Sequence, residues 1–373
     1  MDNFRTLSKT MKQSNSDTSR HTLICGTSGT GMSVYLSYLM RQDIAKGNKI
    51  ILIDPWGDLS EETSKLAGDK VTLIDISNES ANGLCNIFHT SSPQEYDAVA
   101  QKVIDLFVHI YDPEHRGVIG PRFEFAARNI ILTLLYAGIP SFENMHKAMV
   151  DPSFIQTILP HVPEGPVRQY WLQQMPQTSD FHKSEILDYI VSKFGIFMQE
   201  GPIKNIFESS KDHQDLVALM KTKQILLIDT SAIRTNSAIA TIVYMALGTK
   251  LLELTQSNVD PKSIYIDEVN MFAGSETVMQ AFEEGRRAKT EFTVTSRDLE
   301  YMPAVLRSKI LRFGTIVAFR QAVKDGQILA EHFLDSTVTN HSLATQKKYS
   351  FSLRYVDAGE IKVSTDNTID LSD

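Results

Sequence analysis

The sequence lacks the features that mark secreted, membrane-spanning or zinc-scaffolded proteins. Its 373 residues include only two cysteines, Cys25 and Cys85, too few for a disulfide framework or a four-thiolate zinc site. The longest apolar stretches, 130–139 and 239–247, are shorter than the ~20 residues of a membrane span. Residues 1–20 are polar, so they predict a flexible leader and not a signal peptide. We therefore expect a reduced, cytoplasmic protein without direct membrane insertion.

Positive charge is also scarce. The chain has 37 Lys and Arg against 45 Asp and Glu, a net charge of −8. This balance argues against a surface coated with basic contacts to nucleic acid, so a function on DNA would depend on a few local residues. Hydrophobic residues make up 42% of the chain, as in ordinary globular proteins, so it can bury a core.

Short apolar runs alternate with helical periods at both ends of the sequence. The predicted strands are 22–25, 49–54, 70–75, 224–229, 263–267, 291–296 and 314–319. The predicted helices among them are 34–45, 237–254, 277–288, 303–312 and 325–333. This alternation indicates the α/β class, a mostly parallel sheet with helices on both faces. Residues 348–355 and 360–364 predict a terminal hairpin around Asp357-Ala358-Gly359.

The middle of the chain follows a different pattern. Helical periods dominate from residue 92 to residue 222, for example in 98–111, 123–137 and 186–199, and prolines separate them. No comparable strand signal occurs there. We predict three parts, in the order of the chain: the leader 1–20, a core made of 21–91 and 223–373, and an all-helical insertion 92–222.

A glycine-rich segment, GTSGTGMS, lies between the first predicted strand and the helix after it. It fits the phosphate-binding P-loop pattern at every position but one, because Met32 stands where that pattern has lysine. Such a loop turns successive backbone N–H groups toward phosphate oxygens, and the helix N-terminus adds its positive dipole end. The predicted nucleotide-binding residues are Gly26, Thr27, Ser28, Gly29, Thr30, Gly31, Met32 and Ser33.

Two acidic residues close the predicted strand 263–267. At the corresponding place in P-loop NTPases, an aspartate such as Asp267 holds Mg²⁺, and a glutamate such as Glu268 orients or deprotonates the attacking water. The hydroxyl of Ser33 is placed to bind the same Mg²⁺. Two acidic residues after a strand are weak evidence alone, but the P-loop and the order of the strands strengthen the prediction.

Several further segments resemble one known group of proteins. They are IDPWGDL at 53–59, GPR at 120–122, YIDEVNMF at 265–272, EGRR at 284–287 and GTIVAFR at 314–320. Together with the P-loop, they resemble the FtsK–HerA superfamily of P-loop motors, closest to the type IV secretion and conjugation coupling-protein branch. The resemblance runs from about residue 21 to 365. It implies a RecA-like core with an inserted helical subdomain, assembled as a hexameric ring that binds ATP and Mg²⁺ between subunits and DNA in its centre.

The resemblance also implies roles for single residues. Arg286 (or Arg287) is either an arginine finger offered to the neighbouring subunit or an exposed charge at a helix end. Arg297 stands where the family has glutamine, and it either restores positive charge to the site or is an ordinary arginine at a strand end. Asp54 and Asp58 lie near the phosphates, and Trp56 replaces the family's histidine.

These departures leave the function open between two hypotheses. The first is an ATP-binding, ring-forming motor of the DNA-translocase or conjugative-transfer type. The second is a catalytically weakened or inactive nucleotide-binding subunit or scaffold, in a mixed ring or at a secretion complex whose proteins recruit it to the inner face of the membrane. The loss of one electrostatic donor at a transferring group costs roughly 10²–10³ in rate, which is why Met32 matters. A third hypothesis is that Met32 was introduced to trap an inactive state.

Overall fold

The structure is a computed structural model in which the chain forms two compact units. It describes residues 21–90, 92–112, 116–177, 191–198, 201–207, 215–257, 263–357 and 359–369. Within these ranges, unit 1 comprises residues 21–74, 217–234 and 248–369, and unit 2 comprises residues 75–216 and 235–247. The predicted leader lies outside the described residues.

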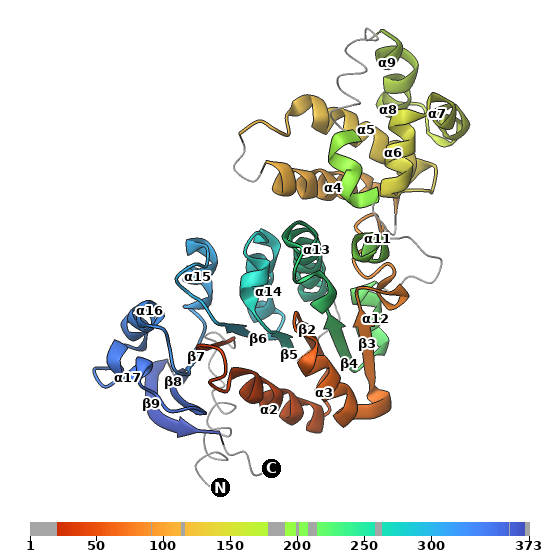
Figure 1. Cartoon of the computed structure of the whole chain (residues 1–373). Helices are drawn as coiled ribbons and strands as arrows, with labels where there is room; N and C mark the ends of the chain where they lie inside the picture. The colour runs from red at the N-terminus through yellow and green to blue at the C-terminus, as the bar shows by residue number, and fades with distance from the viewer. Residues whose placement is uncertain are drawn as a thin grey trace. The chain divides into compact units, whose positions relative to one another are not determined.

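Unit 1 is built on one sheet. Among the described residues, nine strands lie in the order β3-β4-β2-β5-β6-β1-β7-β8-β9 (Figure 1). The strands are β1 (Thr22–Cys25), β2 (Ile50–Asp54), β3 (Val71–Asp75), β4 (Ile225–Asp229), β5 (Ser263–Ile266), β6 (Glu291–Ser296), β7 (Thr315–Ala318), β8 (Ser350–Asp357) and β9 (Glu360–Thr368). Strands β4, β2, β5, β6, β1 and β7 pair in parallel, and β8 and β9 form an antiparallel hairpin. The predicted α/β class and the hairpin are confirmed, although Ala358 of its turn is outside the described residues.

Helices cover both faces of this sheet. Figure 1 shows α2 and α3 on one face and α14 and α15 on the other. The unit 1 helices are α2 (Met32–Ala45), α3 (Asp58–Ala67), η1 (Gly68–Lys70), η7 (Ser231–Ile233), η8 (Val269–Phe272), α14 (Glu276–Arg287), α15 (Ala304–Ile310), α16 (Val323–Phe333) and α17 (Asn340–Ala344). Because both faces are covered, the central strands are mostly buried, and all five residues of β2 are buried.

Two helices have residues in both units, α12 (Leu216–Thr222) and α13 (Ser237–Gln256). Helix α13 begins where the predicted helix 237–254 begins and ends two residues later. Among the described residues it is the one helix that is long and apolar enough to cross a membrane. In this fold, however, 67% of its most apolar window is buried inside the protein, as in a core helix.

The described part of unit 2 is helical. Its elements are η2 (Glu79–Ala81), η3 (Pro93–Glu95), α4 (Tyr96–Tyr111), α5 (Pro121–Tyr136), α6 (Phe142–Val150), α7 (Pro152–Ile158), η4 (Leu159–His161), α8 (Pro166–Gln169), the π-helix η5 (Tyr170–Gln174), α9 (Met175–Gln177), η6 (Gly195–Met198) and α11 (Pro202–Phe207). Of the predicted helix 186–199, residues 191–194 are helical, and residues 186–190 and 199 lie outside the described residues.

Aromatic side chains form the core of unit 2. The ring of Phe107 packs against Phe194 and Phe197, with centroids 4.8 and 5.2 Å apart. Phe142 stacks on Phe197 at 4.2 Å. Such ring pairs add to the stabilisation that comes from burial alone.

The parallel strands of unit 1 bring distant segments together. Parallel strands end at the same edge of a sheet, and ligands of open α/β sheets bind at that edge. Because β6 lies between β1 and β5, the residue that follows β6 lies between the loop after β1 and the acidic pair after β5. This edge of the sheet contains the candidate site.

Candidate functional site

The glycine-rich loop after β1 is fixed against the end of β7. A Cβ atom on Gly26 would lie 2.7 Å from Cβ of Phe319, so only glycine fits at this position. Thr27 donates its backbone N–H to the carbonyl of Arg320 at 2.8 Å. The Thr30 hydroxyl donates to the carbonyl of Thr27 at 2.7 Å and closes the turn.

The conformation of this loop suits an anion. Gly29 and Gly31 have positive φ angles of 76° and 121°, which glycine adopts without strain. Helix α2 begins at Met32 without a side-chain cap and without an acidic residue in its first turn. The first N–H groups of a helix lack intrahelical acceptors and attract anions. The cradle therefore fits a phosphate group, and the half-buried Ser33 lies in the first helical turn beside it.

Met32 is part of the apolar core. Its side chain is 5% exposed. Buried residues of the same cluster include Ile24, Tyr35, Leu36, Phe319, Phe351 and Ile369. A lysine at this position of a P-loop contacts the β- and γ-phosphates, whereas the thioether of Met32 is buried among apolar groups. The loop keeps its phosphate-binding shape but brings no cation of its own.

The acidic pair is held by a continuous chain of hydrogen bonds. The backbone N–H of Glu268 donates to the Thr295 hydroxyl at 2.7 Å. That hydroxyl in turn donates to Oδ1 of Asp267 at 2.6 Å. Glu268 has a φ angle of +65°, a conformation that is rare and costly outside glycine and is often found at functional sites.

Both acids bind protons more readily than exposed carboxylates do. Burial raises the pKa of Asp267. It also raises the pKa of Glu268 to about 7, although the nearby Arg297 counteracts part of that rise. A carboxylate whose pKa lies near neutral pH is well suited to accept a proton from water.

Arg297 lies between the loop and the acidic pair. It directly follows Ser296, whose carbonyl accepts the Gly26 N–H at 3.3 Å. Its Nε lies 3.4 Å from Oε2 of Glu268, and its side chain is 29% exposed. The structure thus brings the segment Gly26–Ser33, Asp267, Glu268 and Arg297 to one edge of the sheet.

A tryptophan with two arginines completes this edge. Cζ of Arg297 lies 4.2 Å from the ring centroid of Trp56, and Cζ of Arg234 lies 4.5 Å from it. Both distances are within the range of a cation–π contact. Sequence reasoning missed Arg234, which follows η7, because no pattern near it indicates a site. Only the order of the strands brings it to Trp56.

Asp54 has a structural task at the end of β2. It is fully buried, and its carboxylate accepts the N–H groups of Trp56 at 2.9 Å and Ser60 at 2.8 Å. These bonds fix the turn that carries Trp56 and the start of α3. Asp58 is exposed in the first turn of α3, where a negative charge favours the helix.

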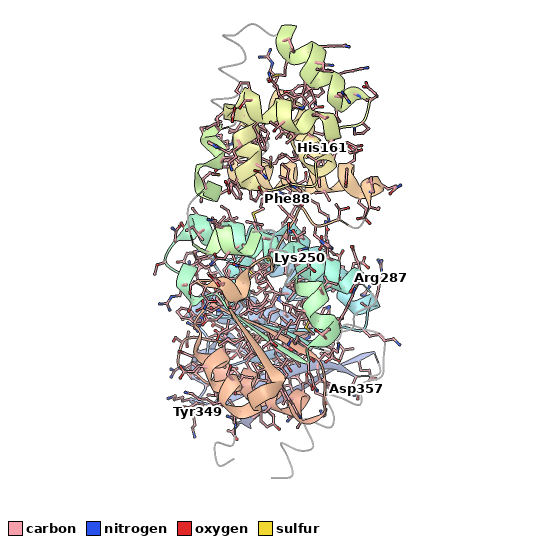
Figure 2. The ribbon with its side chains drawn as sticks, turned by 90° about the vertical axis from the view of Figure 1, so that its right-hand side faces the viewer. Phe88, His161, Lys250, Arg287, Tyr349 and Asp357 are labelled. Atoms are coloured by element: carbon pink, nitrogen blue, oxygen red, sulfur yellow. The ribbon has the colours of Figure 1, made fainter. Side chains whose placement is uncertain are left out.

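Arg286 and Arg287 lie at the opposite edge of the sheet. They end α14, which leads back to the amino end of β6. Arg287, which Figure 2 labels, is 74% exposed and pairs with Glu284 at 2.6 Å. Arg286 is also exposed. Neither joins the loop of its own chain, so an effect on a nucleotide would require a site in a neighbouring subunit.

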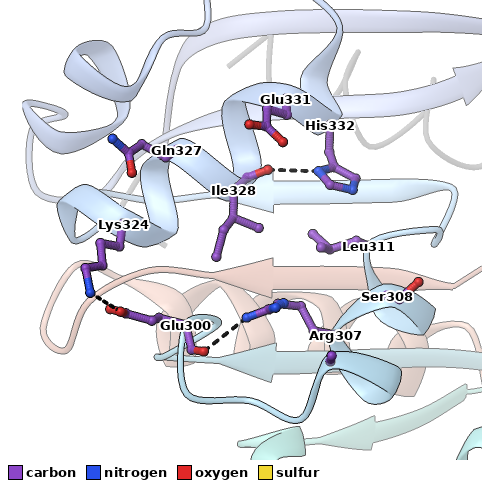
Figure 3. Close-up of a pocket in the computed structure, with 10 residues that line it drawn as sticks. Glu300, Arg307, Ser308, Leu311, Lys324, Gln327, Ile328, Glu331 and His332 are labelled. Atoms are coloured by element: carbon purple, nitrogen blue, oxygen red, sulfur yellow. Dashed lines mark hydrogen bonds and ion pairs between the residues drawn. The ribbon is translucent and has the colours of Figure 1, made fainter.

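A separate groove of about 560 Å³ lies between α15 and α16 (Figure 3). Its lining does not include the loop 26–33 or the acidic pair. Among its charged residues, Lys324 pairs with Glu300, and Arg307 donates to the carbonyl of Glu300 at 3.0 Å. The groove is therefore distinct from the candidate site.

Comparison with known proteins identifies the family of this chain. The model of the family described as "Helicase HerA, central domain" matches residues 11–248, which include the loop, the turn after β2 and β4. The chain belongs to this family. A comparison with curated protein sequences gives no match.

Solved structures share the fold of this HerA-family chain. The unbound bacterial conjugative coupling protein TrwB aligns with a TM-score of 0.65 and 13% identity, over 96% of this chain and 91% of that chain. TrwB in complex with ADP and Mg²⁺ aligns with a TM-score of 0.66 and 13% identity, over 97% and 92%. VirB4 of Thermoanaerobacter pseudethanolicus gives a TM-score of 0.67 and 12% identity, over 96% and 92%. At these identities the likeness establishes a common fold, the RecA-like P-loop core.

Proposed function

We propose that this protein is the ATP-binding subunit of a ring-forming motor of the DNA-translocating, conjugative-transfer type. The observation that carries the proposal is the meeting of the loop 26–33 with Asp267 and Glu268 at one sheet edge in a chain of the HerA family. The likeness to TrwB, which has been solved with ADP and Mg²⁺, supports the choice of nucleotide. The partners we propose are further copies of the chain or a related subunit, DNA in the pore, and membrane-complex proteins that recruit this cytoplasmic protein.

Each part of the site has a distinct task in this proposal. The backbone of Gly29–Ser33 binds the phosphates, and Ser33 and Asp267 hold the Mg²⁺ that neutralises their charge. Glu268 accepts the proton of the attacking water, which its raised pKa favours. Arg286 (or Arg287) lies at the sheet edge opposite the loop of its own chain, and we assign it to the nucleotide of the neighbouring subunit.

The first test is hydrolysis. The protein should hydrolyse ATP, and faster with DNA present. Glu268→Gln keeps the shape of the side chain but removes the base, so we expect a loss of about 10²–10³-fold in turnover. Hydrolysis no faster than in the Glu268→Gln variant would contradict the motor function.

Met32 favours a second function, that of a nucleotide-binding subunit with little hydrolysis. The Met32 side chain is buried in the core and brings no charge to the phosphates. The carboxylate of Glu268 is paired with Arg297, and this ion pair makes Glu268 a weaker base. Calorimetry separates the two functions: ATP binding without turnover indicates the regulatory subunit, and binding with turnover indicates the motor. A protein that binds no nucleotide with or without Mg²⁺ would contradict both and leave only a scaffold.

A further inference from the structure

The candidate site has no cation where a P-loop normally supplies one. Met32 occupies the position of the lysine and lies in the apolar cluster. The opposite side of the site contains Asp54, Asp58, Asp267 and Glu268, of which the first two add to the negative potential at Asp267. A nucleotide triphosphate brings several more negative charges to this place. Mg²⁺ offsets part of this charge, but without a positive group on the protein the remaining repulsion would weaken nucleotide binding.

One arginine lies where such a group is needed. Arg297 follows β6, the strand between β1 and β5, and the carbonyl of the preceding residue accepts the N–H of Gly26. It is therefore adjacent in the sheet to the first residue of the loop. Its contact with Glu268 uses Nε at 3.4 Å, longer than a strong charge-assisted hydrogen bond.

The Trp56 ring gives this arginine a fixed support. The guanidinium group of Arg297 contacts the ring, and that of Arg234 contacts the same ring. Stacking on an aromatic ring orients the planar group and leaves its in-plane N–H donors available to an anion. Trp56 itself is held by the bond from its backbone N–H to the buried Asp54 carboxylate. The support is thus anchored to the end of β2.

We propose that Arg297, held on the Trp56 ring, supplies to the terminal phosphate of the bound nucleotide the positive charge that Met32 does not. This assignment rests on the proposed nucleotide binding, and it identifies the residue that makes triphosphate binding favourable in this chain. Arg234 contributes a second, more exposed positive charge to the same surface. In this site, the positive charge at the phosphates therefore comes from the end of β6, the strand next to β1, and not from the loop.

Calorimetric binding of ADP and of a non-hydrolysable ATP analogue, both with Mg²⁺, tests the assignment. Arg297→Gln keeps a polar side chain of similar reach without the charge. We expect it to weaken binding of the triphosphate by about 10- to 100-fold, as the loss of a hydrogen bond to a charged group does, and to weaken binding of the diphosphate less. A purely structural arginine would weaken both equally. Arg297→Lys should retain part of the affinity.

Lys348→Ala is the matched control. Lys348 is the cation beside Tyr349, with Nζ 4.7 Å from that ring, and Tyr349 packs on Gly31. Its removal should change the affinity for either nucleotide by less than about 2-fold, because an exposed charge is well screened. A loss in this control as large as in Arg297→Gln would overturn the assignment to Arg297.

A double variant tests the exchange directly. Met32→Lys in the Arg297→Gln background should recover part of the lost triphosphate affinity, because a lysine that extends out of the apolar cluster reaches the phosphates as in an ordinary P-loop. Thermal melting checks that each variant is folded. If Arg297→Gln does not fold, nucleotide binding is compared between Arg297→Lys and the unaltered protein. Unchanged or tighter triphosphate binding in Arg297→Gln would overturn this inference alone. Failure of the unaltered protein to bind either nucleotide would overturn the proposed function with it.

Discussion

The two halves of the candidate site are held by different forces. The loop half, Gly26–Ser33 with the side chains that pack on it, depends on apolar contact and close approach. The acid half, Asp267 and Glu268 with Thr295 and Arg297, depends on hydrogen bonds and charge. The difference explains how the loop tolerates methionine: its shape comes from packing, which a thioether satisfies, so a lost lysine leaves the fold intact. The following predictions separate packing from charge.

The largest effects are expected in the loop half, at Gly31 and at Met32. Gly31→Ala forces an alanine to a φ of +121° and places its Cβ 2.9 Å from Tyr349, so we expect a loss of about 2–4 kcal/mol in the free energy of unfolding. Gly29→Ala is the control, because Gly29 has a φ of +76° but open space around it, and should cost about 1–2 kcal/mol. Denaturant unfolding measures both. Equal losses would mean that Tyr349 does not confine the loop.

Met32 should behave as a core residue. Met32→Ala removes buried apolar volume and should cost about 2–4 kcal/mol, whereas Met32→Leu should cost less than about 1.5 kcal/mol. Neither variant changes a titratable group, so both losses should be the same at pH 5 and pH 8. A cost near zero for Met32→Ala would show that the side chain is not packed in the cluster.

Glu268 should show the opposite behaviour, a smaller effect that depends on pH. Burial raises the pKa of Glu268 from 4.5 to about 7. Between pH 4.5 and pH 7, the Glu268 carboxyl group therefore stays protonated in the folded protein but is ionised in the unfolded chain. Its contribution therefore becomes unfavourable as the pH rises from 4.5 through 7. Glu268→Gln should increase stability at pH 8 by about 1–3 kcal/mol and change it little at pH 4.5.

The pH profile needs its own controls. Burial lowers the pKa of His21 to about 4, which destabilises the fold in acid, but this effect is shared by the protein and its variant and cancels in their difference. Glu61→Gln, at an exposed carboxylate on α3, should not reproduce the gain at pH 8. A difference between the Glu268→Gln variant and the unaltered protein that is constant with pH would contradict the raised pKa.

The elements of unit 1 could be predicted because each is encoded locally. The strand 291–296 was predicted at its exact bounds, and the helix 34–45 begins two residues earlier in the structure, at Met32. Buried parallel strands are continuous apolar runs, which are visible in sequence. The sequence shows no apolar periodicity that predicts α3, because most of its residues are polar and only a few, such as Leu59, are buried.

The site was predictable only where a single segment carries it. The loop 26–33 and the pair Asp267-Glu268 have recognisable spacing, and the family model, which matches residues 11–248, covers the loop. The contact of Arg234 and Arg297 with Trp56 joins three segments that follow different strands. The order of the strands brings these three segments together. That order is set by pairing between strands far apart in the chain, so no single segment of the sequence reveals it. For the same reason no sequence pattern predicts that Met32 shares a core cluster with Phe351 of β8 and with Ile369, which follows β9.

The contact between Thr30 and Tyr349, whose backbone N–H donates to the Thr30 carbonyl at 2.8 Å, has a consequence for how the molecule is made. The ribosome synthesises the loop among the first segments of this chain, but synthesises the hairpin that packs on it only after the whole of unit 2. Domains that are synthesised first tend to fold first. This loop, however, reaches its final packing only after the later strands β8 and β9 have been synthesised. The loop is therefore completed only after the hairpin has been made, so a nascent chain that lacks the hairpin would have the loop without the residues that pack on it.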